Sequence, residues 1–460
     1  MRLTAVLFAV LLPTAVSAQE SAPAAEDAAV LRRIYDAALV DSPMYGQLRE
    51  LVEKHPGRLS GSKNLEGAVL WAKAELEKLG CDRIELQAVQ VPHWERGAKE
   101  SAVVRSASGR TASLAVLALG NSAATPPGGR VAEVVEVKSL DELRQLGRER
   151  VAGKIVFFNR PMDRRHISNA PAYVGAVDQR TRGPALASEL GAAAALVRSM
   201  TFADDDVPHT GNTTFPAGVA PIPAAALGVS SAQTLANLIQ TPGATVELKI
   251  HARTLADALS HNVIGEIRGA EAPEKVILVG GHLDSWDVAP GAHDDGAGCV
   301  QALEVLRVLR AAGHRPRHTI RVVLFTNEEN GIRGATEYAR VVGEKNEVHL
   351  LALESDSGGF APHGFNLGNA AGDAHLRAER WLPLLKPYGI HFFQAGTGGV
   401  DVAPLMRFGY TVAGPTQDAP RYFDYHHTAI DTLDKVQPRE LQLGAAAMAA
   451  LVYLVDRHGP

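Results

Sequence analysis

Carboxylate and imidazole side chains stand directly after three apolar segments of the chain, each typical of a buried strand. The apolar segments are residues 275–281, 319–325 and 349–353. The polar side chains that follow them are His282, Asp284, Glu328, Glu329 and Asp356. Ligand sites in open α/β sheets lie beyond the carboxyl ends of the strands, so we expect these side chains to meet in one crevice.

Two further carboxylates, Asp294 and Asp295, lie in a glycine-rich turn just before an apolar helical pattern. Aspartate is a common helix N-cap, which would account for one of them. A cap does not account for Asp294, Asp295, Glu328, Glu329 and Asp356 together. Gathered carboxylates are costly to bury without a compensating cation. The cluster therefore predicts a bound metal ion.

The donor types indicate which metal. Imidazole and carboxylate ligands without a thiolate suit zinc, with manganese or cobalt as alternatives. His282 supplies one imidazole, and the adjacent pair His426 and His427 supplies another. The two cysteines, Cys81 and Cys299, do not form a disulfide scaffold, because they are far apart in sequence and Cys299 lies in an apolar helical pattern.

The elements that must position these residues follow from periodicity. From about residue 262, apolar strands alternate with helical patterns at 296–312 and 331–343. This alternation predicts an α/β fold with a mixed, mainly parallel sheet flanked by helices. Residues 97–255 differ: they are rich in Gly, Ala, Val and Pro and predict short strands broken by turns. We therefore expect a catalytic domain from residues 19–96 and 256–460, and an inserted β-rich module between them.

Bulk properties narrow the functional classes. The chain has 460 residues, a net charge of −5 and a pI near 6.4, and we find no dense run of Lys and Arg. These values argue against a nucleic-acid partner or an anionic membrane surface.

The first residues predict export. Arg2 precedes the apolar stretch 3–12, which is too short to span a bilayer, and Val16-Ser17-Ala18 has the small residues of a cleavage site. We expect residues 1–18 to be a signal peptide and the mature protein to be secreted or periplasmic, without a membrane anchor.

The order of the motifs resembles the co-catalytic zinc aminopeptidase and glutamate carboxypeptidase family. The motifs are His282-Leu283-Asp284, Ala292-His293-Asp294-Asp295-Gly296, Glu328-Glu329, Asp356 and His427 with Asp431-Thr432. Six further segments extend the resemblance, and they are similar to segments of the glutamate carboxypeptidases of this family. They are Val91-Pro92-His93-Trp94, Gly153-Lys154-Ile155-Val156, Arg198-Ser199-Met200, Pro208-His209-Thr210-Gly211, Ser285-Trp286-Asp287 and Tyr425-His426-His427.

The resemblance implies a role for each matching residue. Asp294 would bridge two zinc ions, with a cis peptide bond to Asp295. His282 and Asp356 would complete one zinc site, and Glu329 and His427 the other. Asp284 would orient the His282 ring, and Glu328 would be the general base.

Two residues keep alternatives open. In relatives a Tyr precedes the last ligand histidine and stabilises the oxyanion; here His426 either donates to the oxyanion or is a surface histidine. Asp401, in a glycine-rich segment, either contacts a substrate amine or only caps the following helix.

The resemblance implies hydrolysis of short peptides, above all dipeptides with free termini. An aminopeptidase is the rival, because the same metal core serves both. A metal-free binding protein would lack ligands, and a single-zinc acyltransferase of the glutaminyl cyclase type would bind one ion. The inserted module resembles a protease-associated domain, with no obvious catalytic residue, and a homodimer is expected.

Overall fold

The computed structural model describes residues 22–417 and 419–460. The expected signal peptide, residues 1–18, lies outside the described residues. Over the described ranges, no helix has both the length and the apolar character needed to cross a membrane.

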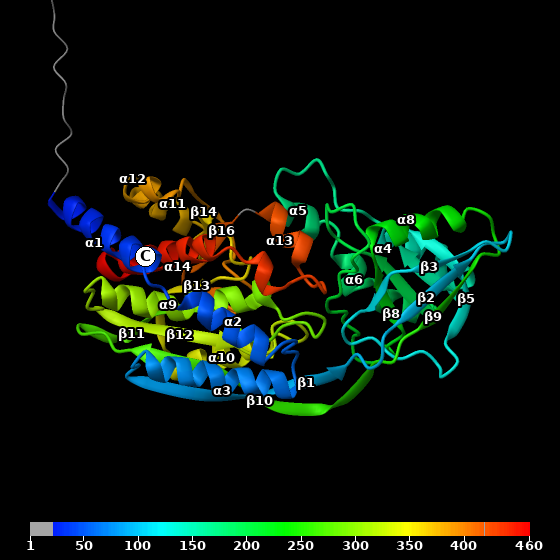
Figure 1. The fold of residues 1–460 in the computed structure, drawn as a ribbon, viewed down its shortest axis with the longest axis horizontal. Coiled ribbons are helices and arrows are strands. Elements are labelled where there is room, and N and C mark those ends of the chain that lie inside the picture. Colours follow the sequence, from blue (N-terminus) through cyan, green and yellow to red (C-terminus); the bar gives the residue numbers. More distant parts are fainter. Residues whose placement is uncertain (1–21, 418) are drawn as a thin grey trace, which may run out of the picture.

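The larger lobe is built on an eight-stranded mixed sheet (Figure 1). Its strands in spatial order are β1 (Arg83–Glu95), β10 (Arg253–Ile267), β12 (His318–Phe325), β11 (Ala272–His282), β13 (Val348–Glu354), β16 (Val412–Gln417), β14 (Pro362–Gly368) and β15 (Phe392–Ala395). The central strands β12, β11, β13 and β16 pair in parallel. Their carboxyl ends therefore lie at one edge of the sheet, as the sequence predicts.

Helices cover both faces of this sheet. One face packs against α1 (Ala22–Leu39), α2 (Met44–Lys54), α3 (Lys63–Lys78), α9 (Ala297–Ala311) and α14 (Pro438–His458). The other packs against α10 (Arg333–Lys345) and the 3₁₀ helix η4 (Ala403–Phe408). Strand β11 feeds both cores because successive side chains of a strand alternate: Ile277 and Val279 join one, and Val276 and Leu278 the other. The expected α/β fold, mainly parallel with flanking helices, is confirmed.

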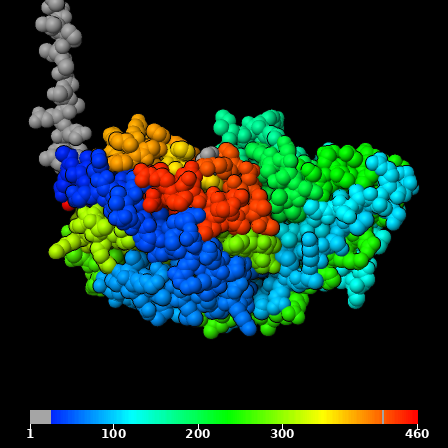
Figure 2. Space-filling model, in the orientation of Figure 1, coloured from blue at the N-terminus to red at the C-terminus, as the bar shows by residue number. Residues whose placement is uncertain are grey.

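A second eight-stranded sheet lies between β1 and β10 in the sequence. Its strands in spatial order are β3 (Thr111–Leu114), β2 (Ser101–Arg105), β9 (Thr245–Lys249), β5 (Arg130–Val137), β6 (Ile155–Phe158), β7 (Ala194–Arg198), β8 (Ala224–Leu227) and β4 (Val116–Ala118). The helices α4 (Leu140–Val151), α7 (Gly183–Glu189) and α8 (Val229–Leu238) pack on it. These residues form a lobe of their own, cyan to green in Figure 2, which we call the inserted lobe.

Strands β1 and β10 connect the two lobes. They pair antiparallel from Arg83 opposite Glu266 to Glu95 opposite Arg253, so the chain leaves the larger sheet and returns to it along one ribbon. A second contact is made where α5 (Asn169–Val174) of the inserted lobe lies beside α13 (Ala419–Tyr425) of the larger lobe (Figure 1). The Tyr173 and Phe423 rings meet there with centroids 4.7 Å apart.

Candidate metal centre

The carboxylate of Asp294 lies between two groups of side chains. On one side, its Oδ1 is 3.2 Å from His282 Nε2, and that nitrogen is 3.4 Å from Asp356 Oδ1. A nitrogen and two oxygens therefore converge on one point, and these three residues have the arrangement of a metal site.

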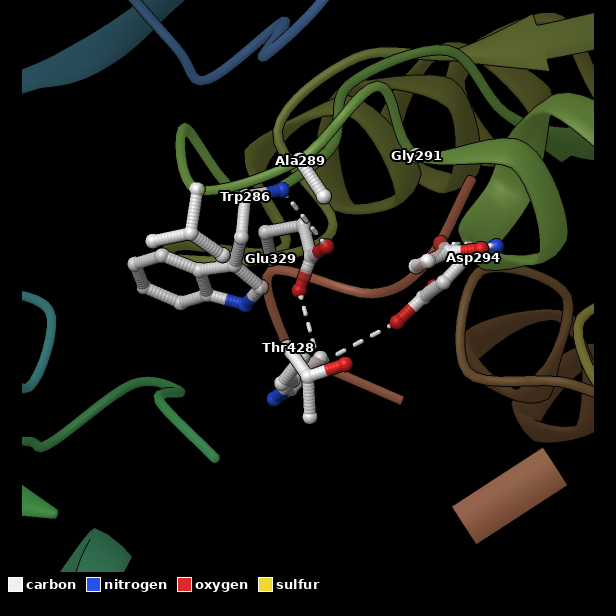
Figure 3. Close-up of a pocket in the computed structure, with 9 residues that line it drawn as sticks. Trp286, Ala289, Gly291, Asp294, Glu329 and Thr428 are labelled. Atoms are coloured by element: carbon white, nitrogen blue, oxygen red, sulfur yellow. Dashed lines mark hydrogen bonds and ion pairs between the residues drawn. The ribbon is translucent and has the colours of Figure 1, made fainter. Parts of the chain in front are cut away.

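The second oxygen of Asp294 faces a different histidine. His427 Nε2 is 3.4 Å from Asp294 Oδ2 and 3.0 Å from Glu329 Oε2. Figure 3 shows the carboxyl groups of Asp294 and Glu329 directed toward the same small pocket. His426 Nε2 also approaches Asp294 Oδ2, at the longer distance of 4.0 Å, so Glu329 and His427 are the better matched pair.

Each of these residues comes from the end of a different element. His282 ends β11, Glu329 follows β12, and Asp356 follows β13. Asp294 lies in the short helical turn Ala292–Gly296 before α9, and His427 follows α13. Because β11, β12 and β13 are parallel neighbours, residues 74 positions apart in sequence (282 to 356) meet at one edge of the sheet.

The site is short of positive charge. Within the described chain, the buried atoms Asp294 Oδ2 and Glu329 Oε2 have no hydrogen-bond partner. Burial raises the pKa of Glu329 well above its usual range, and the Asp294 carboxylate raises it further. Burial also raises the pKa of Asp356. Buried anionic oxygens of this kind match hard or borderline divalent cations, and the nitrogen and oxygen donors fit zinc.

A layer of buried groups fixes the ligand loops. Asp295 accepts the backbone N–H groups of His282 and Gly298, at 2.9 and 3.0 Å. Asp431 accepts those of His293 and Asp294, at 2.7 and 3.1 Å. The Asp294–Asp295 peptide bond is cis, so the expectation drawn from the resemblance is confirmed.

The Asp284 carboxylate holds the backbone of Glu328 and Glu329 rather than the His282 ring. The carboxylate accepts the backbone N–H groups of Glu328 and Glu329, at 3.0 and 3.2 Å. His282 Nδ1 lies 3.1 Å from the backbone carbonyl of Asp284 and 3.8 Å from its carboxylate. The Asp284 main chain, more than its side chain, is therefore what orients His282.

A cleft of about 860 Å³ opens onto the site. Glu328, Asp356, His426 and His427 line it. Burial raises the pKa of Glu328 well above its usual range, as a carboxylate that takes up a proton requires. His426 is 8% exposed and its ring stacks on that of His427 with centroids 3.5 Å apart, so it is not a surface histidine. Burial lowers the pKa of His426 to about 3.

Asp401 does not reach the cleft. Its side chain is 1% exposed, and within the described chain neither carboxylate oxygen has a hydrogen-bond partner. It also does not cap η4, because Glu354 Oε2 accepts the backbone N–H groups of Asp401 and Val402 instead. Neither role expected for Asp401 matches this geometry.

The inserted lobe supplies part of the cleft. The resemblance to a protease-associated domain implies a place over the cleft or a role in contacts, but it names no residue. Tyr173, Val174, Arg180 and Asn212 line the wall that faces the proposed metal ligands, and only their position in the fold identifies them. Arg58 was also missed; it is fully buried and donates to the carbonyls of Leu283, Pro290 and Gly291 below the site.

Comparison with known proteins agrees with this geometry. The sequence pattern described as "Peptidase family M28" matches residues 262–452. Human carboxypeptidase Q (Homo sapiens) is 37% identical over 414 residues, which cover 89% of this chain and 84% of the relative. The bovine protein of the same name (Bos taurus) is also 37% identical, over 412 residues.

Solved structures extend the similarity to the fold. The crystal structure of a peptidase M28 precursor from Shewanella amazonensis SB2B matches with a TM-score of 0.88 and 32% identity, covering 94% of this chain and 97% of that one. An aminopeptidase from Aneurinibacillus sp. strain AM-1 shares the fold, with a TM-score of 0.64 at 21% identity over 93% and 95% of the two chains. With identity above 30% to relatives that it matches over most of its length, the chain belongs to peptidase family M28 and is a metallo-exopeptidase.

Proposed function

We propose that the protein hydrolyses short peptides, above all dipeptides with free termini, with two zinc ions held by His282, Asp294, Glu329, Asp356 and His427. The observation that carries the proposal is the position of Asp294. Its two oxygens face two different histidines, at 3.2 and 3.4 Å, as a bridging ligand of a two-metal site must do.

Each side chain at the site has a separate role in the proposed hydrolysis. Bound zinc supplies Lewis acidity and makes water a nucleophile at neutral pH. Glu328 lines the cleft beside the ligands and takes the proton of the attacking water, then returns it to the leaving amine. Asp284 holds the backbone of Glu328 and so keeps this carboxylate directed at the cleft. His426, neutral and buried at the cleft, donates to the carbonyl oxygen as negative charge develops there.

The cleft favours small substrates. A volume of about 860 Å³ lies within the range of pockets that enclose small ligands. The inserted lobe forms one wall of it, which limits how far a peptide can extend past the reacting bond. We base the proposed preference for dipeptides on this wall and on the similarity to carboxypeptidase Q.

A dipeptide panel tests the proposal. Dipeptides with free, acetylated and amidated termini are assayed with and without a chelator, and zinc per chain is measured by elemental analysis. We expect two zinc ions, activity on free dipeptides, and its loss with chelator. Activity that survives chelation, or a chain that binds a single zinc, would contradict the proposal. Retained activity on amidated peptides with loss on acetylated ones would identify an aminopeptidase instead.

Export and assembly belong to the same proposal. We propose that residues 1–18 direct secretion or transfer to the periplasm, and that the mature chain forms a homodimer with no nucleic-acid or membrane partner. N-terminal sequencing of the exported protein, expected to begin at Gln19, and the mass in solution test these two statements.

A further inference from the structure

His427 is held by the inserted lobe through its backbone and its ring at once. Its φ of 61° lies in the left-handed region, which residues other than glycine adopt only when their surroundings hold them there. The backbone N–H of Thr210 donates to the His427 carbonyl at 2.9 Å. The Thr210 carbonyl lies 3.3 Å from His427 Nδ1. One residue of the inserted lobe therefore contacts both parts of a metal ligand.

The proton on the His427 ring follows from this arrangement. Nε2 faces Glu329 and Asp294, so this nitrogen offers its lone pair to a bound cation. Nδ1 then carries the proton, and this N–H donates a hydrogen bond to the Thr210 carbonyl. A carbonyl in this position fixes the orientation of a ligand histidine. His282 has an equivalent partner, but from the larger lobe: the Asp284 carbonyl, 3.1 Å from its Nδ1.

Arg180 fixes the Thr210 carbonyl in turn. Its Nη1 donates to that oxygen at 3.2 Å and lies 3.4 Å from His427 Nδ1. The guanidinium lies over the Tyr173 ring, 5.6 Å from its centroid, and the residue is 5% exposed. Gly211 leaves room for it: with a φ of +136°, a Cβ at this position would overlap the guanidinium. The loop is thus shaped around Arg180.

We propose that Arg180 is a positioning residue of the metal centre, which orients His427 through the Thr210 carbonyl, so that the inserted lobe completes one of the two zinc sites. The inference rests on the proposed function, since it requires that site to bind zinc. The inference goes beyond the proposed function because it makes one zinc site depend on the contact between the lobes. The site of His282 and Asp356 does not depend on that contact.

The test compares Arg180→Met with Arg182→Met in the full mature chain. Arg182, two residues along, has a side chain that is 68% exposed and serves as the matched control. Zinc bound per chain is measured in buffers with a series of free zinc concentrations. The absorption spectrum of the cobalt-substituted protein reports the geometry of each site. Arg180→Met is expected to weaken one of the two zinc affinities about 10–100-fold, the usual effect of losing such an outer partner. The other affinity and both affinities of Arg182→Met stay at the wild-type values. Arg180→Lys, which keeps a donor, recovers part of the loss.

The outcomes separate this inference from the proposed function. A folded Arg180→Met variant that binds both ions as tightly as the wild type overturns the inference and leaves the proposed function standing. A wild-type chain that binds fewer than two ions overturns the proposed function itself. Should Arg180→Met not fold, Gly211→Ala displaces the guanidinium without removing it. Wild-type zinc affinities in that variant would equally overturn the inference.

Discussion

Glu328 and Glu329 are adjacent in the sequence, and we propose a different role for each. Both side chains line the cleft, but only Glu329 also lines the small pocket beside it, where its Oε2 lies 3.0 Å from His427 Nε2. Asp284 accepts both backbone N–H groups, so the pair is held as a unit. We propose that Glu329 acts as a metal ligand and Glu328, the adjacent residue, as the general base.

Replacing Glu328 should therefore remove chemistry without removing metal. In Glu328→Gln we expect kcat to fall about 10²–10⁴-fold, the contribution of a positioned proton acceptor. Zinc content should stay at the wild-type value, as measured by elemental analysis of the dialysed protein. The exposed Glu53→Gln is the control. A variant that lost zinc in proportion to activity would make Glu328 a ligand rather than the base.

His426 should act in its neutral form. Because burial lowers its pKa to about 3, the ring stays neutral from pH 5 to pH 9 and donates through one N–H. We expect His426→Ala to lower kcat about 10²-fold, as loss of an oxyanion donor does. The alkaline and acid limbs of the pH profile should keep their midpoints. The exposed His391→Ala is the matched control. Unchanged kcat in His426→Ala would exclude the role.

At the scale of single residues, the sequence indicates which side chains have the chemistry of a metal site. It does not indicate where each side chain lies in the fold. The five proposed ligand residues stand out because carboxylates and histidines follow apolar strands at several places. Asp401 fits the same pattern of an acidic residue in a glycine-rich loop, yet its side chain is buried away from the cleft. Arg58 and Arg180 gave no signal, since a lone arginine in sequence is most often a surface residue.

The loop between β11 and α9 is held in place by the buried guanidinium of Arg58. Arg58 donates to the carbonyls of Leu283, Pro290 and Gly291, at 2.8, 2.6 and 3.1 Å. Carbonyls left buried without a donor are costly, so we expect Arg58→Met to lower the free energy of unfolding by about 3 kcal/mol. Zinc affinity should fall as well, because this loop leads into Asp294. Denaturant unfolding, with the exposed Arg49→Met as control, measures the change. Equal stability of both variants would contradict the role.

The C-terminal helix α14 is tied to the sheet by one carboxylate. Asp456 accepts from His314 Nε2 at 2.9 Å, His318 Nδ1 at 3.0 Å, and the backbone N–H groups of Arg317 and His318. Burial alone would raise the pKa of Asp456, but these hydrogen bonds lower it overall. A folded-state pKa below the unfolded value stabilises the fold above the unfolded pKa, about 4, and that stability is lost as the pH falls further.

Asp456→Asn should therefore cost stability in a pH-dependent way. We expect the variant to be about 2–3 kcal/mol less stable than the wild type at pH 7, the value of hydrogen bonds to a charged group. The difference should shrink as the pH falls from about 5 to 3, because the wild-type carboxyl becomes protonated. Unfolding curves at several pH values measure it. A difference that stays constant down to pH 3 would mean that the charge of Asp456 does not matter.

At the scale of elements, buried periodic segments were the predictable part. The strands β11, β12 and β13 and the helices α9 and α10 are found within two or three residues of the predicted ranges, because their apolar patterns are long and regular. The short strands β14, β15 and β16 were not predicted. They hold four to seven residues each, and their pairing depends on neighbours distant in sequence rather than on a local pattern.

The whole molecule should be stabilised by the ions that it binds. A ligand that binds only the folded chain adds about 2.7 kcal/mol at a free concentration of 100 times its Kd. Removing metal also leaves the buried Asp294 and Glu329 and the partly buried Asp356 without a cation. We expect chelation to lower Tm by several degrees, and zinc to restore it, in calorimetry or thermal scanning. Magnesium, which prefers oxygen ligands, is the control ion. An unchanged Tm would argue that no metal is held by the folded state.

At this scale the sequence does not predict how the second sheet lies against the larger one. Composition changes near residue 92, and all strands of the second sheet lie between Ser101 and Lys249. That Thr210 would meet His427, 217 residues later, follows only from the folded structure.

We expect the proposed metal ligands, which are far apart along the chain, to meet late during folding. His282 and His427 are separated by 145 positions, and the Thr210 contact reaches back a further 72. Contacts between such distant residues form late, after the chain entropy of long loops has been lost. We therefore expect a partly folded chain to lack the complete centre, and peptidase activity to appear only after both lobes have folded and the Thr210–His427 contact has formed.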